Sequence, residues 1–299
     1  MRFLVLGAAA GGGLPQWNCG CQNCAMARSL DLRPQTQSSL AVSLDGLSWA
    51  ILNASPDIRQ QINNNAQLYP RGLRDTPIIS VVLTNGDLDH IAGLLTLRES
   101  QPFRIVLTGA IAGVLDSNPV FRVLDQATVQ RDLVVLNESF QLLPGLDASL
   151  FAVPGKVALF MEDEDATIGV ESENVIGVAL STQGLRAFYI PGCAHLTETL
   201  ATRIRGADIV FFDGTLFTDD EMIRTRTGTK TGWRMGHMPI SGEGGSLEVL
   251  ARLDIGRIVY THINNTNPIW RDGPERDLVL RHGFEVGCDG AEISLATRA

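Results

Sequence analysis

The sequence contains no apolar run that approaches the roughly 20 residues required for a membrane span. Its apolar start continues into glycine-rich sequence (residues 1–13) with no further apolar core and no small-residue cleavage site. We therefore expect a first strand there and not a secretion signal. Together these absences argue against a channel or a membrane-embedded carrier, and they favour a cytoplasmic protein.

The sequence also has no cluster of positively charged residues. The net charge is −9, and no stripe of lysine and arginine offsets it. Nucleic acids and anionic membranes both favour clustered positive charge, so neither is an expected partner and membrane insertion is not expected. A small or peptide-like substrate suits this charge better.

Nothing in the sequence marks a domain boundary, because it has no repeat, no low-complexity segment and no linker rich in proline and serine. We expect one domain over residues 1–299. Apolar residues make up 44% of the chain and charged residues 19%, which is typical of a protein that folds alone around a buried core.

Runs of β-branched and apolar residues recur along the chain, with helical stretches between several of them. Ser55, Pro56 and Asp57 predict a helix start as N-cap, first helical residue and first-turn acid. This pattern favours an α/β (αββα) fold in which two sheets pack between layers of helices. The predicted strands are residues 2–6, 39–44, 49–52, 77–83, 104–107, 133–136, 175–180, 187–190, 209–212 and 257–260.

The five cysteines are an odd number, and three of them lie within six residues, at Cys19, Cys21 and Cys24. This spacing is too tight for a disulfide framework, and it suits a tetrahedral Zn²⁺ site built on thiolates. Free thiols in a loop are the alternative. Cys193 and Cys288 stand alone and are expected to be small buried residues.

Residues 84–93 (TNGDLDHIAG) follow a predicted buried strand and combine several polar groups. The segment resembles the H-x-H-x-D-H motif of the metallo-β-lactamase superfamily, with Asn85 and Asp87 at the first two histidine positions and with Asp89 and His90 retained. Turn and helix-cap chemistry is an alternative, in which Asp89 caps a helix starting near Ile91.

Further segments follow the order found in that superfamily, and with them the chain resembles the PqqB family of pyrroloquinoline quinone (PQQ) biosynthesis over nearly its whole length. The resemblance implies the metallo-β-lactamase fold, a two-sheet β-sandwich flanked by helices. The segments are residues 11–19, 53–61, 188–193, 210–215, 236–238 and 260–268.

Departures from the superfamily pattern concern one of its two metal sites. The resemblance places Asn85, Asp87 and a turn at Val153–Lys156 where relatives carry three histidines, and Gly192 where they carry the bridging carboxylate. Hydrolysis by two metals requires both ions about 3.5–4 Å apart. We therefore do not expect ordinary hydrolase activity.

The resemblance leaves the second metal site with Asp89, His90 and the late His262. Two histidines and one carboxylate are the ligands of non-haem Fe(II) oxygenases, which keep positions open for O2 and substrate. The PqqB family is assigned to hydroxylation of the tyrosine ring in the peptide-derived Glu-Tyr precursor of PQQ, which agrees with iron. Asp87 is a fourth ligand or a residue that orients a ligand.

Other assignments also follow the resemblance. His237, in the segment 236–238, resembles a histidine beside the metal and is expected to act as general acid or base, with a structural histidine as the alternative. Asn265 stands where relatives carry a histidine and is a candidate fourth zinc ligand. His195 and His282 match no motif position. Residues 225–234, which include Arg226, Lys230 and Arg234, form either a positive lid over an acidic peptide substrate or a solvated loop.

A second function also fits the resemblance. A fold that has lost its hydrolytic ligands can persist as a binding protein, and this family has been described as helping PQQ to move toward the periplasm. The alternative is therefore a non-catalytic carrier of PQQ or its precursor. Other proteins of the PQQ pathway are candidate partners in either case.

Overall fold

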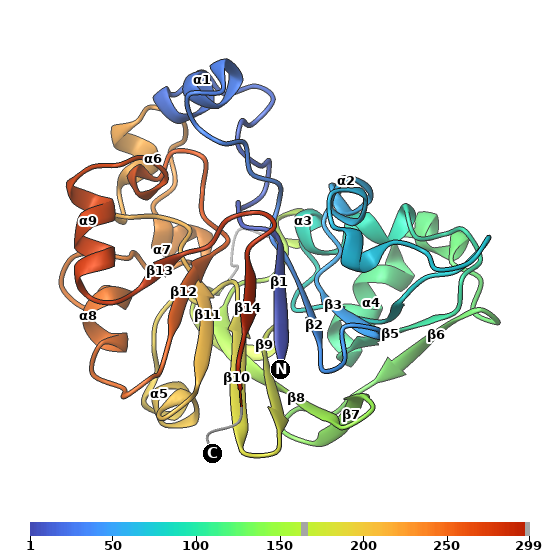
Figure 1. Ribbon diagram of the computed structural model, residues 1–299. Coiled ribbons are helices and arrows are strands. Elements are labelled where there is room, and N and C mark those ends of the chain that lie inside the picture. The colour runs from blue at the N-terminus through green and yellow to red at the C-terminus, as the bar shows by residue number, and fades with distance from the viewer. Residues whose placement is uncertain (163–166, 297–299) are drawn as a thin grey trace.

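The structure is a computed structural model that describes residues 1–162 and 167–296. Two seven-stranded sheets pack face to face, with helices on both outer sides (Figure 1). This is the αββα sandwich expected from the sequence. Within the described ranges, no helix combines the length and the apolar character needed to cross a membrane.

The first sheet contains most strands from the N-terminal half of the chain. Strands β3, β4, β5 and β6 run parallel, because helical segments connect them, whereas β14, β1, β2 and β3 pair antiparallel. In spatial order the strands are β14 (Glu292–Ser294), β1 (Arg2–Gly7), β2 (Ser39–Ser43), β3 (Trp49–Leu52), β4 (Ile78–Val82), β5 (Phe103–Leu107) and β6 (Val129–Leu133).

The second sheet takes most of its strands from the C-terminal half. Strands β10 to β13 are parallel, and β7, β8, β9 and β10 are antiparallel. In spatial order the strands are β13 (Glu285–Val286), β12 (Ile258–Thr261), β11 (Ile209–Asp213), β10 (Leu185–Ile190), β9 (Val170–Thr182), β8 (Leu146–Gly155) and β7 (Ser139–Leu143).

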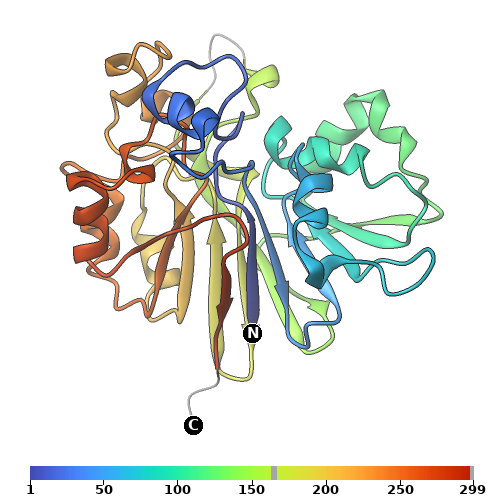
Figure 2. The same cartoon turned by 45° about the horizontal axis from the view of Figure 1, so that its top comes forward.

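Helices cover the outer face of each sheet (Figures 1 and 2). The α-helices of the first half are α1 (Gln22–Ser29), α2 (Ile58–Asn63), α3 (Leu88–Ile91) and α4 (Gly109–Ser117). Those of the second half are α5 (Glu198–Ile204), α6 (Glu221–Arg224), α7 (Gly232–Met235), α8 (Ser246–Leu250) and α9 (Pro274–Arg281). Short 3₁₀ turns are η1 (Ala66–Leu68), η2 (Ala92–Leu95), η3 (Pro119–Val123), η4 (Leu159–Met161) and η5 (Pro268–Trp270).

The core lies between the two sheets. Phe3 of β1 and Phe211 of β11 meet across it, with their ring centroids 5.0 Å apart. Tyr189 and Tyr260 are also fully buried, and Ser38 and Ser246 each hydrogen-bond one of their hydroxyls. Burial of these large rings supplies much of the apolar area that holds the sheets together.

The parallel strands place the loops that follow them at one edge of the sandwich. Residues after β4, β10, β11 and β12 all leave the sheets there, near α1 and α3 at the top of Figure 1. Ligands bind beyond the carboxyl ends of parallel strands in open α/β sheets. The polar segments 84–90, 190–193, 213–215 and 262–267 therefore meet in one region.

Several sequence predictions were wrong in detail. The helix expected from Ser55 begins at Ile58, because Pro56 and Asp57 form a turn, and the Ser55 hydroxyl accepts from the Asp57 amide at 3.3 Å. The strand expected at residues 133–136 lies at Val129–Leu133. Leu133 and Val135 are apolar but exposed, so hydrophobicity was a poor guide there.

The turn expected at Val153–Lys156 is also wrong. Val153, Pro154 and Gly155 are the last residues of β8, and the register with β9 shifts between Ala152 and Pro154. Proline lacks a backbone donor and is tolerated in a strand at such an irregularity. Lys156 follows the strand directly.

Candidate metal centre and its pocket

Asp89 and His90 belong to α3, which lies at this edge of the sandwich. The chain leaves β4, turns through residues 83–87 and enters α3 with Asp87 as the residue before its first turn. Asp89 lies inside that turn, so it does not cap a helix beginning near Ile91, and that alternative was wrong. Its carboxylate instead approaches His262, which follows β12.

The imidazoles of His90 and His262 face the same carboxylate oxygen. His262 Nε2 lies 3.1 Å from Asp89 Oδ2, and His90 Nε2 lies 3.7 Å from it. Among the described residues, no group hydrogen-bonds the buried His90 Nε2. One ligand atom from each of the three residues lies within 4.8 Å of the others. A buried nitrogen without a partner, beside a second imidazole and a carboxylate, fits a metal ion.

Contacts at the second ring nitrogen, Nδ1, hold the two imidazole rings in place. Thr84 Oγ1 lies 3.3 Å from His90 Nδ1, and Thr215 Oγ1 lies 2.8 Å from His262 Nδ1. Asn53 Nδ2 in turn donates to Thr84 Oγ1 at 2.9 Å. Hydrogen bonds of this kind fix ring orientation and tautomer at metal sites. They leave both Nε2 atoms directed toward Asp89.

Electrostatic interactions keep Asp89 and His90 in the protonation states that can donate lone pairs to a metal ion. Burial alone would raise the pKa of Asp89, but His90 and His262 hold that pKa well below its usual range. Burial lowers the pKa of His90 to about 4, against the opposing effect of Asp89. Near pH 7 the His90 ring is therefore neutral and its Nε2 can act as a ligand.

His262 has the opposite shift and an unusual backbone. Its burial would lower its pKa, but the hydrogen bond and the charge of Asp89 raise it. Its φ of 53° lies in the left-handed region, which a residue with a side chain seldom adopts. Such a conformation costs on the order of 1–3 kcal/mol and is concentrated at functional sites.

A carboxylate that sequence reasoning missed, Asp213, lies at the end of β11. Asp213 Oδ2 is 2.7 Å from His237 Nδ1 and accepts from the Cys193 amide at 2.9 Å. Its other oxygen accepts from the amide and hydroxyl of Thr215. Burial would raise the pKa of Asp213, but the charge of His237 lowers it below its usual value. Its place at the end of a buried strand, within the motif segment 210–215, was the available signal.

His237 stacks on His262, with ring centroids 5.2 Å apart and 23° between the planes. Asp213, His237 and His262 form a second group whose ligand atoms lie within 4.8 Å of one another. Gly192 is beside it, since a Cβ there would lie 3.5 Å from His237 Cε1. The nearest carboxylate to His237 therefore comes from β11 and not from residues 190–193.

Asn85 and Asp87 line the same pocket but bond to each other. Asn85 Nδ2 donates to Asp87 Oδ2 at 3.0 Å, and the Asp87 amide donates to Asn85 Oδ1 at 3.0 Å. In the described part of the chain, Asp87 is not among the groups whose ligand atoms converge. Its role as a direct ligand stays a prediction.

The pocket over these residues has a volume of about 410 Å³, which suits a small ligand. Asp89, His90, His237 and His262 line it. Its lining also includes Lys156, Lys230, Met222, Met235 and Asn264.

The remaining histidines lie outside this pocket. The His195 ring lies 5.8 Å from that of Trp233, and no described group hydrogen-bonds its buried Nδ1. His282 ends α9, and its Nδ1 is 2.9 Å from the carbonyl of Leu278. Of the segment 225–234, Lys230 lines the pocket and Arg226 is exposed.

The three clustered cysteines meet at a second place, beside the loop after β12. Their Sγ atoms lie within 4.8 Å of one another. Asn265 Nδ2 lies 3.2, 3.5 and 3.3 Å from the sulfurs of Cys19, Cys21 and Cys24. The end of the Asn265 side chain thus occupies the fourth corner of the group. Cys193 is buried and Cys288 only partly so.

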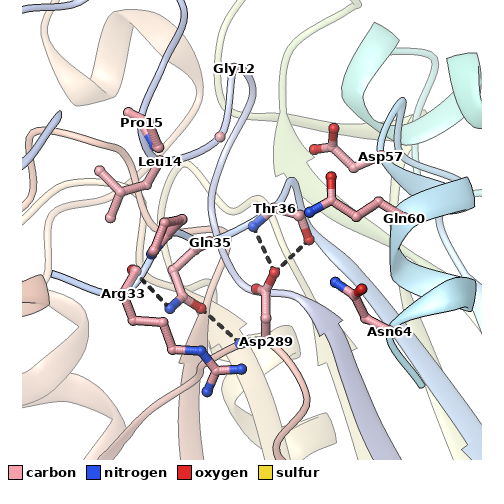
Figure 3. A pocket seen from close by; sticks show the side chains of 12 residues that line it. Gly12, Leu14, Pro15, Arg33, Gln35, Thr36, Asp57, Gln60, Asn64 and Asp289 are labelled. Carbon is pink, nitrogen blue, oxygen red and sulfur yellow. Dashed lines mark hydrogen bonds between the residues drawn. The ribbon is translucent and has the colours of Figure 1, made fainter. Parts of the chain in front are cut away.

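Figure 3 shows another cavity, of about 360 Å³, between the N-terminal loop and α2. Its buried carboxylate, Asp289, accepts from the amide and hydroxyl of Thr36 and from the Ala8 amide. These bonds join three segments of the chain. Asp289 therefore has a structural role, and we assign no chemistry to this cavity.

Comparison with known proteins agrees with the fold and the motifs. Residues 48–263 match the family model described as "Beta-lactamase superfamily domain". Coenzyme PQQ synthesis protein B of Rhizobium meliloti (strain 1021) is 63% identical over 297 residues, covering 99% of this chain and 98% of the relative. The protein of the same name from Methylobacterium radiotolerans is 53% identical and covers 99% and 100% of the two chains.

Solved structures agree as well. The crystal structure of Zn(2+)-bound PqqB from Methylobacterium extorquens has a TM-score of 0.97 and 53% identity, and it covers 99% of this chain and 100% of its own. A diphosphatase from the PhnP family has a TM-score of 0.69 at 21% identity, with 98% and 97% coverage, and shows the shared fold.

The fold, the polar loops at one edge of the sandwich and the matched family model define a protein of the metallo-β-lactamase superfamily. Within that superfamily, the chain belongs to the coenzyme PQQ synthesis protein B (PqqB) family.

Proposed function

We propose that this chain catalyses an O2-dependent hydroxylation in PQQ biosynthesis, on the tyrosine ring of the peptide-derived Glu-Tyr precursor. Asp89, His90 and His262 would hold Fe(II). The observation that carries the proposal is the buried His90 Nε2, which has no hydrogen-bond partner among the described residues and is directed with His262 Nε2 at one oxygen of Asp89. Two imidazoles and one carboxylate form the ligand set that suits Fe(II) with open positions.

Bound Fe(II) would supply the redox chemistry that activates O2 next to the substrate. The chain's own residues supply the rest. Thr84 and Thr215 orient the two imidazoles, and the pocket of about 410 Å³ has room for the substrate ring. Asp87 lies next to Asn85, where it orients the loop or joins the ligand set.

His237 is the proposed general acid or base. Because its Nδ1 faces Asp213 at 2.7 Å, its Nε2 is the nitrogen left to accept or release a proton. The buried Asp213 carboxylate holds the ring in this orientation. This arrangement lets His237 take a proton from the substrate phenol or return one within the pocket.

A structural zinc ion at Cys19, Cys21 and Cys24 completes the proposal, with Asn265 at the fourth position. The three converging sulfurs support it, and so does the zinc-bound relative from Methylobacterium extorquens. Asn265 presents Nδ2 to the sulfurs in this structure. Rotation of the amide would present its oxygen instead.

The test is metal analysis of purified variants after anaerobic loading with Fe(II), followed by mass detection of oxygen added to a Glu-Tyr dipeptide. We expect His90→Ala and His262→Ala to lose most iron and O2 consumption while they keep the fold and the zinc at the cysteines. His282→Ala, at the exposed end of α9, is the matched control. Wild-type iron and hydroxylation in His262→Ala would refute the assignment.

The carrier function is the other outcome of the same experiment. A carrier of PQQ or its precursor needs no iron, so it would bind the ligand without iron uptake and without O2 consumption. The unpartnered His90 nitrogen favours the enzyme.

A further inference from the structure

The chain contains 24 lysine and arginine residues, but only Lys156 and Lys230 are lysines. Both line the pocket of the candidate metal centre. All other fixed cations of the side chains are arginines. Lysine and arginine differ physically, since lysine offers a compact charge with three donors on a flexible stem. The placement of both lysines at one pocket therefore indicates a specific use.

Glu162 holds the two lysines together. Lys156 Nζ donates to Glu162 Oε1, and Lys230 Nζ donates to Glu162 Oε2 at 3.1 Å. The Lys156 and Glu162 side chains are 12% and 11% exposed, so this pair is largely withdrawn from solvent. Lys230 is 38% exposed and lies at the outer side.

The backbone around the pocket makes room for this arrangement. Lys156 follows the end of β8, and its stem passes over Gly236, where a Cβ would lie 3.1 Å from Lys156 Cγ. Gly236 has a φ of 85° and directly precedes His237. A side chain at position 236 would push the lysine away from the pocket. The lysine stem and the catalytic histidine are thus fitted to each other.

Among residues 1–162 and 167–296, the charges in this cluster do not balance. Two ammonium groups there meet the carboxylate of Glu162, which uses one of the three donors of each. Burial would raise the pKa of Glu162, but its hydrogen bonds with Lys156 and Lys230 lower it, so Glu162 is ionised. Within the described part of the chain, one positive charge and several donors therefore remain for a second carboxylate.

We propose that Lys156 and Lys230 form a carboxylate-binding subsite, positioned by Glu162, that selects carboxylate-bearing substrates for this pocket. The inference rests on the proposed function, since it places the acidic end of the substrate at the lysines and its ring toward Asp89, His90 and His262. A glutamate-containing precursor carries carboxylates at the end away from its tyrosine ring. Such a carboxylate brings the cluster to two positive and two negative charges.

The two lysines also supply a direct probe. Protein grown with lysine labelled with ¹³C at Cε has two lysine signals, one for each residue, and single Lys→Met variants assign them. The protein is loaded with Zn²⁺, which is diamagnetic, and titrated with glutarate or with glutaramide at constant ionic strength. We expect glutarate to shift both signals and glutaramide to shift neither. Unmoved signals, or equal shifts with both compounds, would overturn the subsite.

Affinity measurements give the second readout. Lys156→Met and Lys230→Met should each weaken glutarate binding by roughly tenfold or more, because each removes a charge-assisted hydrogen bond. Lys230→Arg should retain part of the affinity. Arg224→Met, which removes one exposed positive charge from nearby α6, is the matched control and should change binding little. Equal losses in Arg224→Met and the lysine variants would show a general charge effect and reject the subsite.

Hydroxylation of Glu-Tyr is measured in parallel so that the two proposals can fail separately. Lysine signals that respond to glutarate without any hydroxylation would reject the proposed reaction and support the subsite. Hydroxylation that is the same in wild type and in Lys156→Met/Lys230→Met, with lysine signals indifferent to glutarate, would reject the subsite alone.

Discussion

At the scale of single residues, the arrangement of His237 and Asp213 limits what the site can do. The 2.7 Å contact fixes the tautomer of His237, because the buried carboxylate accepts the proton of Nδ1. Two donors from Thr215 and one from Cys193 hold the carboxylate itself. Asp213 is a positioning residue that acts through His237.

Asp213→Asn should therefore lower kcat by roughly 100-fold or more, the range of a lost general acid or base. It should also change the pH profile of kcat, because His237 loses the charged hydrogen-bond partner of its Nδ1. Kinetics over pH 5–9 and a thermal unfolding midpoint for each variant are the measurements. In His237→Gln/Asp213→Asn, the second change should add little to the first. If the losses in kcat of the two single variants multiply in the double variant, Asp213 acts independently of His237.

At this scale, the family resemblance identified residues that stand at motif positions. Asp89, His90 and His262 were expected together and lie within 4.8 Å of one another. Asp213 was missed because an aspartate at a strand end is common, and only the fold shows that it faces His237. Lys156 was predicted to lie in a turn, and no role was predicted for it. The sequence already shows, however, that lysine is rare in this chain.

At the scale of elements, the buried strands were the most predictable part of the fold. β3 was predicted with its observed bounds, and β4, β10, β11 and β12 were predicted within two residues. β7 and β8 were missed. In β8, alternating burial and Pro154 weaken the apolar run that marks a strand.

Short α6 contains a second buried acid that gives a prediction on pH. Glu221 lies in its first turn, accepts from the Phe217 amide at 2.7 Å and accepts from Thr266 Oγ1 at 2.5 Å. Burial raises the pKa of Glu221 to about 7, above its ordinary value of 4.5. The folded protein therefore holds a proton there that the unfolded chain releases at lower pH.

Since the folded pKa is the higher one, this contribution to stability is complete below about pH 4.5 and is lost as pH rises through about 7. The loss amounts to about 3 kcal/mol of unfolding free energy. Glu221→Gln keeps both hydrogen bonds, because its amide oxygen can accept from Phe217 and its NH₂ can donate to Thr266. Urea unfolding of wild type and variant at pH 4.5–8 measures the difference. Parallel pH dependences in the two proteins would contradict the shifted pKa.

At the scale of the whole molecule, the candidate sites join distant parts of the chain. The loop after β12 supplies His262, and it also bonds to the N-terminal segment, since Ile263 donates to the Ala8 carbonyl and Ala10 donates to the Ile263 carbonyl. Asn23 donates to the carbonyls of Asn265 and Asn267. Residues more than 200 positions apart thus fix the same loop. The family resemblance implied part of this contact, since it made Asn265 a candidate ligand beside the three cysteines. Residue spacing alone did not predict it, because spacing carries no information about long-range pairs.

The cysteine group lies on that contact, and this gives the prediction for the molecule as a whole. A zinc ion at Cys19, Cys21 and Cys24 would tie α1 and the N-terminal loop to Asn265. Cys21→Ser should lower zinc content and unfolding free energy together, because the energy of binding a structural metal is part of the folding energy. Each tenfold loss of zinc affinity removes about 1.4 kcal/mol of stability at excess zinc.

The comparison requires a control that removes a thiol elsewhere. Cys288→Ser is suitable, since Cys288 is partly exposed and lies outside the group, and it should keep the zinc content and stability of the wild type. Zinc is measured by elemental analysis after gel filtration, and stability by chemical unfolding with and without a chelator. The chelator should destabilise wild type and Cys288→Ser but change Cys21→Ser little, because that variant has little zinc to lose. Unchanged zinc in Cys21→Ser would contradict the site, and the loop after β12 would then be held to the N-terminal segment by its hydrogen bonds alone.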